Sequence, residues 1–274
     1  MGEAKYIISA YGIIGIILII LTELNFFIKI QPFEKIYFPI VWLGYILFVD
    51  GLTYKIRGKS FVKNNLPSLV GMFVISAPFW KIFEYINLRL GNWHYIGTEY
   101  FGRYDDLFAF ISFSTVIPAF FITLQLFKPE IEKSIPEKKL SKKSFGVILL
   151  TGLVSFILML TLPKYLFPLE WISLFLIFDS INYYNKQPSL IYALNTGQNK
   201  LIKNIAITSL TLGFLWEFWN YWASVKWVYN VPFADFLKIF EMPALGYLGY
   251  IPFGFEIFSF YFFVRWLFKK NLNL

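Results

Sequence analysis

Long hydrophobic segments alternate with short polar ones along the whole chain. Each hydrophobic segment is roughly 20 residues long, the length that an α-helix needs to cross the apolar core of a bilayer. The segments lie near residues 7–28, 36–54, 66–88, 105–127, 144–163, 166–184, 202–222 and 247–268. This pattern predicts an all-α integral membrane protein with about eight transmembrane helices.

Composition agrees with a membrane protein and excludes several kinds of chemistry. The 274 residues are 57% hydrophobic, 22% aromatic and 15% charged, whereas a soluble domain carries about 25% charged residues. The absence of cysteine excludes disulfides, thiolate chemistry and Cys-ligated metals. His94 is the single histidine, so a metal site built from several imidazoles is excluded too. We expect no metal site, and the sequence leaves the identity of any cofactor unknown.

The positive charges predict the orientation in the membrane. A net charge of +8 would suggest a nucleic-acid partner in a soluble chain. Here the cations lie in short loops, so we expect no nucleic acid and interpret them as topology signals. Most of them fall on one side of the predicted membrane: Lys5, Lys55, Arg57, Lys59, Lys63, Lys128, Lys133, Lys138, Lys139, Lys142, Lys143, Lys186, Lys200, Lys203, Arg265, Lys269 and Lys270. The positive-inside rule then predicts a multi-pass protein of the cell membrane with both termini cytoplasmic.

Three spaced patterns occur twice in the same order. The pattern K-x-x-F-P-x-x-W-x7-D-x3-Y starts at Lys35 and again at Lys164. An aromatic-Glu-aromatic-x-Asn pattern and a Trp-x-Tyr pattern follow it in each half. We predict two four-helix repeats, residues 1–128 and 144–274, joined by a charged cytoplasmic linker at 129–143. Because an even number of spans returns the chain to its starting side, the repeats would be parallel, with a substrate site at their interface.

The repeated Glu and Asn residues are the candidate catalytic groups. Glu84 and Asn87 share one helix face, as do Glu217 and Asn220. A carboxyl in an apolar segment is energetically costly, so we expect it either to have a hydrogen-bond partner or to serve a function. Two nearby carboxyls in a medium of low dielectric cannot both ionise at low cost, so one would keep a proton and act as a general acid, with the amides orienting the pair. Alternatives are coordination of a hard cation and plain interhelical hydrogen bonding.

Aromatic side chains surround these groups and form the predicted substrate-binding wall. Such a wall suits cation–π binding of a quaternary ammonium group or a carbocation. The candidate substrate-binding residues are Trp80, Trp93, Tyr95, Trp216, Trp219, Trp227, Tyr229 and Glu256. Asp50 and Asp179 lie toward the cytoplasmic side and form a second polar layer, either functional or paired with nearby Lys and Arg at the membrane surface.

Together these features favour a membrane-embedded enzyme that acts on a lipid or isoprenoid by carboxyl acid/base chemistry, in the manner of a cyclase or isomerase. Membrane lipids and a hydrophobic or amphiphilic small molecule are the expected partners. Two alternatives stay open at the level of sequence. One is a transporter or channel for a cation or small amphiphile, and the other is a membrane scaffold protein.

Overall fold

The computed structural model describes residues 8–127, 129, 131 and 142–268. In this part of the chain, seven helical segments are long and apolar enough to cross a membrane, which confirms the all-helical, multi-pass class. They are α1 (Ala10–Ile28), α2 (Tyr37–Arg57), α4 (Leu66–Leu90), the segment Gly102–Gln125, α7 (Lys142–Thr161), α11 (Asn199–Trp222) and the segment Ala244–Leu267. Most of the predicted linker at 129–143 lies outside the described residues.

The sixth predicted span is shorter than expected. The hydrophobic segment near 166–184 forms α9 (Glu170–Tyr184), which has 15 residues, fewer than the roughly 20 that a bilayer core requires. Pro168 accounts for the loss of the first turn, because proline lacks a backbone N–H and disfavours helix at the preceding residue. It lies in a 3₁₀ turn, Phe167–Leu169, between the short α8 (Pro163–Leu166) and α9.

Two other predicted spans are composite. The fourth contains α5 (Asp105–Phe113) and α6 (Val116–Gln125), separated at Ser114 and Thr115. Both hydroxyls donate to backbone carbonyls three residues earlier, which competes with regular helix hydrogen bonding. The last span enters through a 3₁₀ segment, Ala244–Gly249, before α12 (Tyr250–Leu267).

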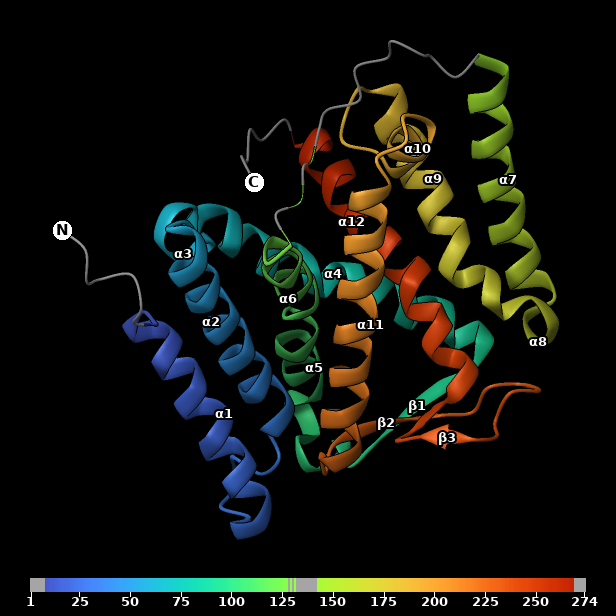
Figure 1. The fold of residues 1–274 in the computed structure, drawn as a ribbon. Coiled ribbons are helices and arrows are strands. Elements are labelled where there is room, and N and C mark those ends of the chain that lie inside the picture. Colours follow the sequence, from blue (N-terminus) through green and yellow to red (C-terminus); the bar gives the residue numbers. More distant parts are fainter. Residues whose placement is uncertain (1–7, 128, 130, 132–141, 269–274) are drawn as a thin grey trace.

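The helices run between two ends of the molecule (Figure 1). At one, here named the strand end, β1 (Trp93–Ile96) pairs antiparallel with β2 (Lys226–Tyr229). There β3 (Lys238–Ile239) also pairs with β4 (Met242–Pro243). The other, the linker end, carries the short helices α3 (Phe61–Asn64) and α10 (Leu190–Asn195). The pairing of β1 with β2 joins segments from the two halves of the chain.

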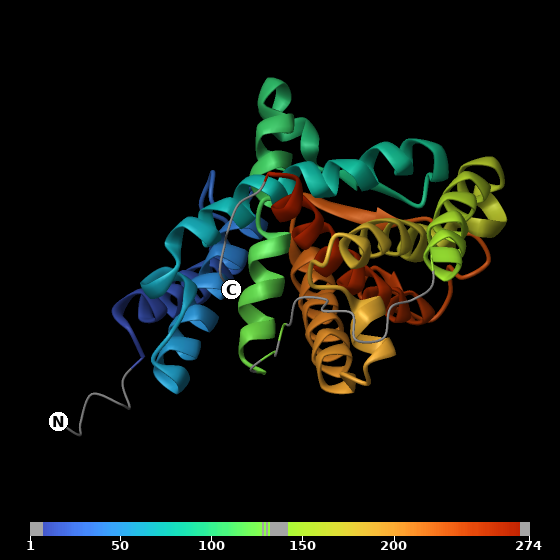
Figure 2. The ribbon, with the colours of Figure 1, turned by 90° about the horizontal axis from the view of Figure 1, so that it is seen from above.

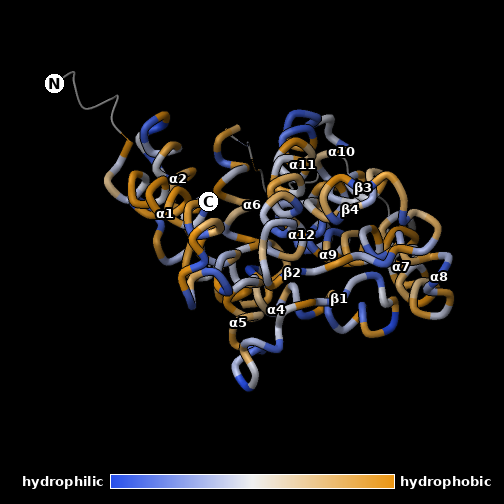
Figure 3. Tube along the Cα trace, turned by 90° about the horizontal axis from the view of Figure 1, so that it is seen from below, coloured by the Kyte–Doolittle hydropathy of each residue, from blue (hydrophilic) through white to orange (hydrophobic). Residues whose placement is uncertain are grey.

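The outer helices present apolar side chains outward. In Figure 3, which colours the Cα trace by hydropathy, most of α1 and α7 is hydrophobic, and the two helices lie on opposite sides of the molecule. Ile14 and Leu21 of α1 are 51% and 57% exposed, and Leu150 and Ile157 of α7 are 60% and 59% exposed. Contact between these apolar side chains and water is unfavourable, whereas contact with lipid tails is not. The outer surface therefore agrees with a membrane-embedded protein.

Helix α4 links the two halves and builds one side of the site. It begins beside α3 and crosses the molecule toward α7 and α8 (Figure 2). At its far end Arg89 Nε donates to the carbonyl of Leu160 in α7, at 3.0 Å. Ring contacts anchor the middle, where Phe83 stacks on Trp171 of α9 with centroids 5.7 Å apart. Helix α4 therefore carries Glu84 from the first half into contact with the second half.

Candidate functional site

A cavity of about 360 Å³ lies at the strand end, between α4, α5, α11 and α12 and beneath the paired strands β1 and β2. Its lining is rich in aromatic side chains, which include Trp80, Tyr95, Trp171, Trp216, Tyr229 and Phe253. A space of this size and apolar character fits a small hydrophobic ligand or part of a larger one. The charged side chains in its lining are few: Lys35, Lys81, Glu84, Asp105, Asp106 and Lys226.

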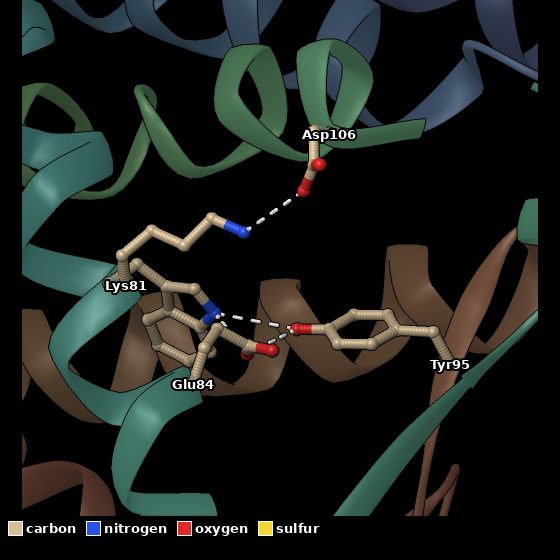
Figure 4. A network of polar contacts seen from close by, with 5 residues as sticks. Lys81, Glu84, Tyr95 and Asp106 are labelled. Atoms are coloured by element: carbon tan, nitrogen blue, oxygen red, sulfur yellow. Dashed lines mark hydrogen bonds and ion pairs between the residues drawn. The ribbon is translucent and has the colours of Figure 1, made fainter. Parts of the chain in front are cut away.

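Among the carboxyls that line the cavity, Glu84 is held in place by hydrogen bonds from aromatic side chains. Its Oε1 atom accepts hydrogen bonds from Trp80 Nε1 at 2.9 Å, Trp93 Nε1 at 3.1 Å and Tyr95 OH at 2.8 Å. Among the described residues, no group donates to the other oxygen, Oε2. Figure 4 shows the Glu84 carboxyl directed at the Tyr95 hydroxyl. The three donors fix the carboxyl and leave one oxygen available for a ligand or a proton.

An ion pair lies beside this carboxyl. Lys81 precedes Glu84 by one helical turn, and its Nζ atom lies 3.5 Å from Asp106 Oδ1 of α5 (Figure 4). The Asp106 side chain is 97% exposed, so this pair adds little to stability. Because Asp106 both lines the cavity and is exposed, the cavity reaches the protein surface beside α5.

Glu217, the repeated counterpart of Glu84, does not line the cavity. It is fully buried on α11, and its Oε1 atom accepts from Tyr229 OH at 2.8 Å and Tyr250 OH at 2.5 Å. Both tyrosines line the cavity, so Glu217 lies directly behind its wall. Its Oε2 atom has no hydrogen-bond partner among the described residues.

The phenols that hold the two carboxyls stay protonated near neutral pH. Burial raises the pKa of Tyr95 in β1, and the charge of Glu84 raises that pKa further. Burial likewise raises the pKa of Tyr229 in β2, with Glu217 adding to the effect. Each hydroxyl is therefore a permanent donor to its carboxyl.

Asn87 and Asn220 position the strands, and their amides hydrogen-bond to backbone groups rather than to the carboxyls in the described part of the chain. Asn87 Nδ2 donates to the carbonyl of Trp93 at 2.8 Å, and its Oδ1 accepts from the Asn92 backbone N–H at 2.8 Å. Asn220 bonds both backbone groups of Trp227, each at 2.9 Å. Each amide thus anchors the turn between its helix and the following strand, and places the aromatic residues of that strand.

The two strands bring the repeated Trp-x-Tyr residues together. Trp93 lies opposite Tyr229, and Tyr95 lies opposite Trp227, in the antiparallel register. Of the predicted substrate-binding residues, those that line the cavity are Trp80, Trp93, Tyr95, Trp216, Trp227 and Tyr229. The hydrogen bonds that run from β1 to Glu84 and from β2 to Glu217 therefore come from one small sheet.

Two predicted substrate-binding residues lie elsewhere. Trp219 Nε1 donates to Glu23 Oε1 of α1 at 2.9 Å, and Tyr37 OH donates to the same oxygen at 3.0 Å. Trp219 therefore ties α11 to α1. Glu256 is fully buried in α12, and its carboxyl faces the backbone of Phe175 in α9.

Asp50 and Asp179, the predicted second layer, each hold the start of a short helix at the linker end. Asp50 accepts from the backbone N–H groups at the start of α3, with Phe61 N at 2.8 Å. Asp179 accepts from Leu190 N at 3.0 Å and Ile191 N at 2.7 Å at the start of α10. Helix N-termini carry unpaired N–H groups and favour anions. Within the described chain neither carboxylate pairs with Lys or Arg.

Sequence reasoning missed Glu170 and Tyr250. Glu170 opens α9, is fully buried, and has no hydrogen-bond partner on either carboxyl oxygen within the described residues. Glu170 lies inside the predicted span 166–184 but has no repeated counterpart in the first half that would single it out. Tyr250 lies in a Gly- and aromatic-rich stretch near the start of the last span, where the sequence distinguishes it from no neighbouring aromatic residue. Only the fold brings its hydroxyl to Glu217.

Neither a metal site among the described residues nor a similar protein assigns a function to this chain. In the described ranges, no group of three or more His, Asp or Glu side chains is arranged to hold a metal ion. No protein-family model, curated protein or solved structure matches this chain.

Proposed function

We propose that this protein is a membrane-embedded enzyme that acts on a lipid or isoprenoid and uses Glu84 to transfer a proton. The observation that carries the proposal is the aromatic cavity in which three ring donors hold the Glu84 carboxyl by one oxygen. The free oxygen would give a proton to a double bond or take one from an adjacent carbon. The surrounding ring faces would stabilise the positive charge that such a step creates.

The surface near the cavity supports entry of substrate from the membrane. Helix α5 lines the cavity through Phe108 and Ala109, and on another face it exposes Leu107 and Phe110. A lipid-facing helix that also borders the cavity offers a hydrophobic molecule a lateral route. Lys81 at the border would bind an anionic or polar head while the apolar part enters.

Filling the cavity is the first test of this function. Ala109→Phe adds a ring to the lining, and Leu107→Phe adds the same ring on the exposed side of α5 as a matched control. We expect lipid extracts from cells that express the wild type or Leu107→Phe to contain a product that is lost with Ala109→Phe. Identical lipid profiles for cells with the wild type and cells without the protein would contradict the proposed enzyme.

A transporter for a cation or small amphiphile is the second candidate. The buried carboxyls of Glu170 and Glu256 favour it, because such groups often lie on ion pathways through membranes. Purified protein in liposomes distinguishes the two functions. Wild-type protein should modify an added lipid extract without moving protons or Na⁺ across the bilayer, whereas a transporter would move one of them and leave the lipids unchanged.

We infer in addition that the two halves are parallel four-helix repeats. Three pairs of contacts support this inference: Asp50 and Asp179 at the short helices, Asn87 and Asn220 at the strands, and the reciprocal pairing of Trp-x-Tyr residues. Figure 1 agrees, because α1 and α7 run in the same direction, as do α2 and α9. The units proposed are residues 1–128 and 144–274.

The proposed orientation places the linker end and both termini in the cytoplasm. Lys59 and Glu99 are exposed at the linker end and the strand end, respectively. Because the chain has no cysteine, single variants report cleanly. In intact cells an impermeant thiol reagent should label Glu99→Cys and leave Lys59→Cys unlabelled until the membrane is opened. The reverse pattern would overturn the orientation.

A further inference from the structure

Three carboxyls lie on adjacent helices and lead from the cavity into the protein interior. Glu84 is on α4, Glu170 opens α9, and Glu256 is on α12. Ring contacts next to them hold the three helices together. Trp171 stacks on Phe83 with centroids 5.7 Å apart and contacts Phe253 edge-on at 5.5 Å.

The inner two carboxyls interact with their neighbours in this order. Glu170 interacts electrostatically with Glu84, and Glu256 interacts electrostatically with Glu170. Glu84 lines the cavity, whereas Glu170 and Glu256 are both 0% exposed. The inner pair therefore lies behind the cavity carboxyl, out of contact with solvent.

Neither inner carboxyl has a cation or a side-chain donor among the described residues that would stabilise a negative charge, and the polar group that faces Glu256 is the backbone of Phe175 in α9. All four of their oxygen atoms lack a hydrogen-bond partner within the described residues. An unpaired carboxylate in the protein interior is strongly unfavourable, and such a group takes up a proton instead.

The charged groups on the helices packed around the pair have partners of their own. On α4, Lys81 pairs with Asp106 and Arg89 bonds the Leu160 carbonyl. On α12, Arg265 is near the linker end, beside Tyr261. On α7, residues 144–161 contain no titratable side chain. On α11, Glu217 bonds its two tyrosines.

We propose that Glu170 and Glu256 form a buried proton-binding pair behind Glu84, in which both carboxyls hold a proton at neutral pH. When Glu84 gives its proton to substrate it becomes a carboxylate, which its three ring donors stabilise, and the neutral pair places no second negative charge beside it. An isomerisation or cyclisation later releases a proton from the product carbon to Glu84, so the cycle needs no further reactant. The catalytic role of the pair rests on the proposed function, but its protonation does not.

Infrared spectroscopy of the full-length protein in alkyl maltoside micelles, which contain no ester carbonyl, tests the pair without any substrate. A protonated carboxyl has a C=O stretching band that a carboxylate lacks, and Gln preserves the shape of Glu. At neutral pH we expect the wild type to show this band, and Glu170→Gln and Glu256→Gln each to lose part of it. The exposed residue Glu99 supplies the control, and Glu99→Gln should keep the full band.

Two results would overturn the proposal. One is a wild-type spectrum without a protonated-carboxyl band at neutral pH, or a full band in both variants. The other is loss of the band when choline chloride is replaced by NaCl, which would assign the pair to Na⁺. A wild-type spectrum without the band overturns the proposal even if a variant does not fold. Product formation by Glu84→Gln is measured separately, so failure of the enzyme and failure of the proton pair are distinguishable.

Discussion

Glu84→Gln is expected to lower the rate of product formation by at least about 100-fold, while expression and melting temperature stay near those of the wild type. A positioned acid or base contributes about 10²–10⁴-fold to rate. The Gln carbonyl oxygen can still accept from Trp80, Trp93 and Tyr95, so the packing of the cavity is preserved. Only the transferable proton is lost. The measurement is the initial rate for purified protein with the lipid fraction that the wild type converts.

Glu217→Gln is the matched control for this change. Glu217 has the same local sequence as Glu84, but it reaches the cavity only through Tyr229 and Tyr250. We expect its rate to fall by less than about ten-fold, because no proton transfer through this carboxyl is required. A near-normal rate for Glu84→Gln would end the catalytic role of Glu84. An equally severe loss in both variants would support chemistry shared by the two carboxyls.

Asp179→Ala is expected to have the largest effect on stability, a loss of at least about 2 kcal/mol in the free energy of unfolding. Buried donors left without an acceptor cost about 1–3 kcal/mol each. Asp179 accepts from the Leu190 and Ile191 N–H groups, and also from the hydroxyls of Ser189 and Ser259. The variant therefore releases the start of α10 and one contact to α12. Reversible unfolding in mixed micelles measures the change.

Asp235→Ala is the control for that experiment. Asp235 is 46% exposed and pairs with Lys238 on the surface, so its removal should change stability by less than about 1 kcal/mol. Hydrogen exchange supplies a second readout, because Asp179→Ala should speed exchange at the Leu190 and Ile191 amides. Wild-type stability together with unchanged exchange would contradict the helix-capping role.

Hydropathy predicted the membrane class but not where each helix ends. A window average counts apolar side chains, and the segment near 166–184 has enough of them. Pro168 nevertheless keeps its first part out of α9, because a helix end depends on backbone hydrogen bonds. The same limit applies at Ser114 and Thr115, which separate α5 from α6.

The polar residues could be selected from the sequence, but their partners could not. Glu84, Asn87 and Asp179 were selected because each belongs to a repeated sequence pattern and because polar groups in apolar segments are energetically costly. Helical spacing then suggested that Asn87 faces Glu84, whereas its amide turns to the backbone of the next strand. Asp179 likewise bonds N–H groups beyond the following turn. Such contacts depend on loop geometry, which periodic patterns do not encode.

The difference between Glu84 and Glu217 needs information from distant parts of the chain. Their local patterns are alike, and each is followed by a strand that donates a Tyr hydroxyl. Tyr250 at the start of α12 adds a second phenol to Glu217, whereas Trp80 and Trp93 complete the shell of Glu84. One repeated motif therefore yields a cavity carboxyl in the first half and a buried one in the second.

A hydrophobic substrate that the aromatic cavity holds against Glu84 should be visible in a cryo-EM map of the wild-type protein in nanodiscs made with lipids from its own cells. We expect elongated density between Tyr95 and Tyr229, with one end beside the Glu84 carboxyl, and an opening toward lipid next to α5. A cavity without such density, or a water-filled passage that opens to both faces of the membrane, would show that the cavity does not hold a lipid substrate against Glu84.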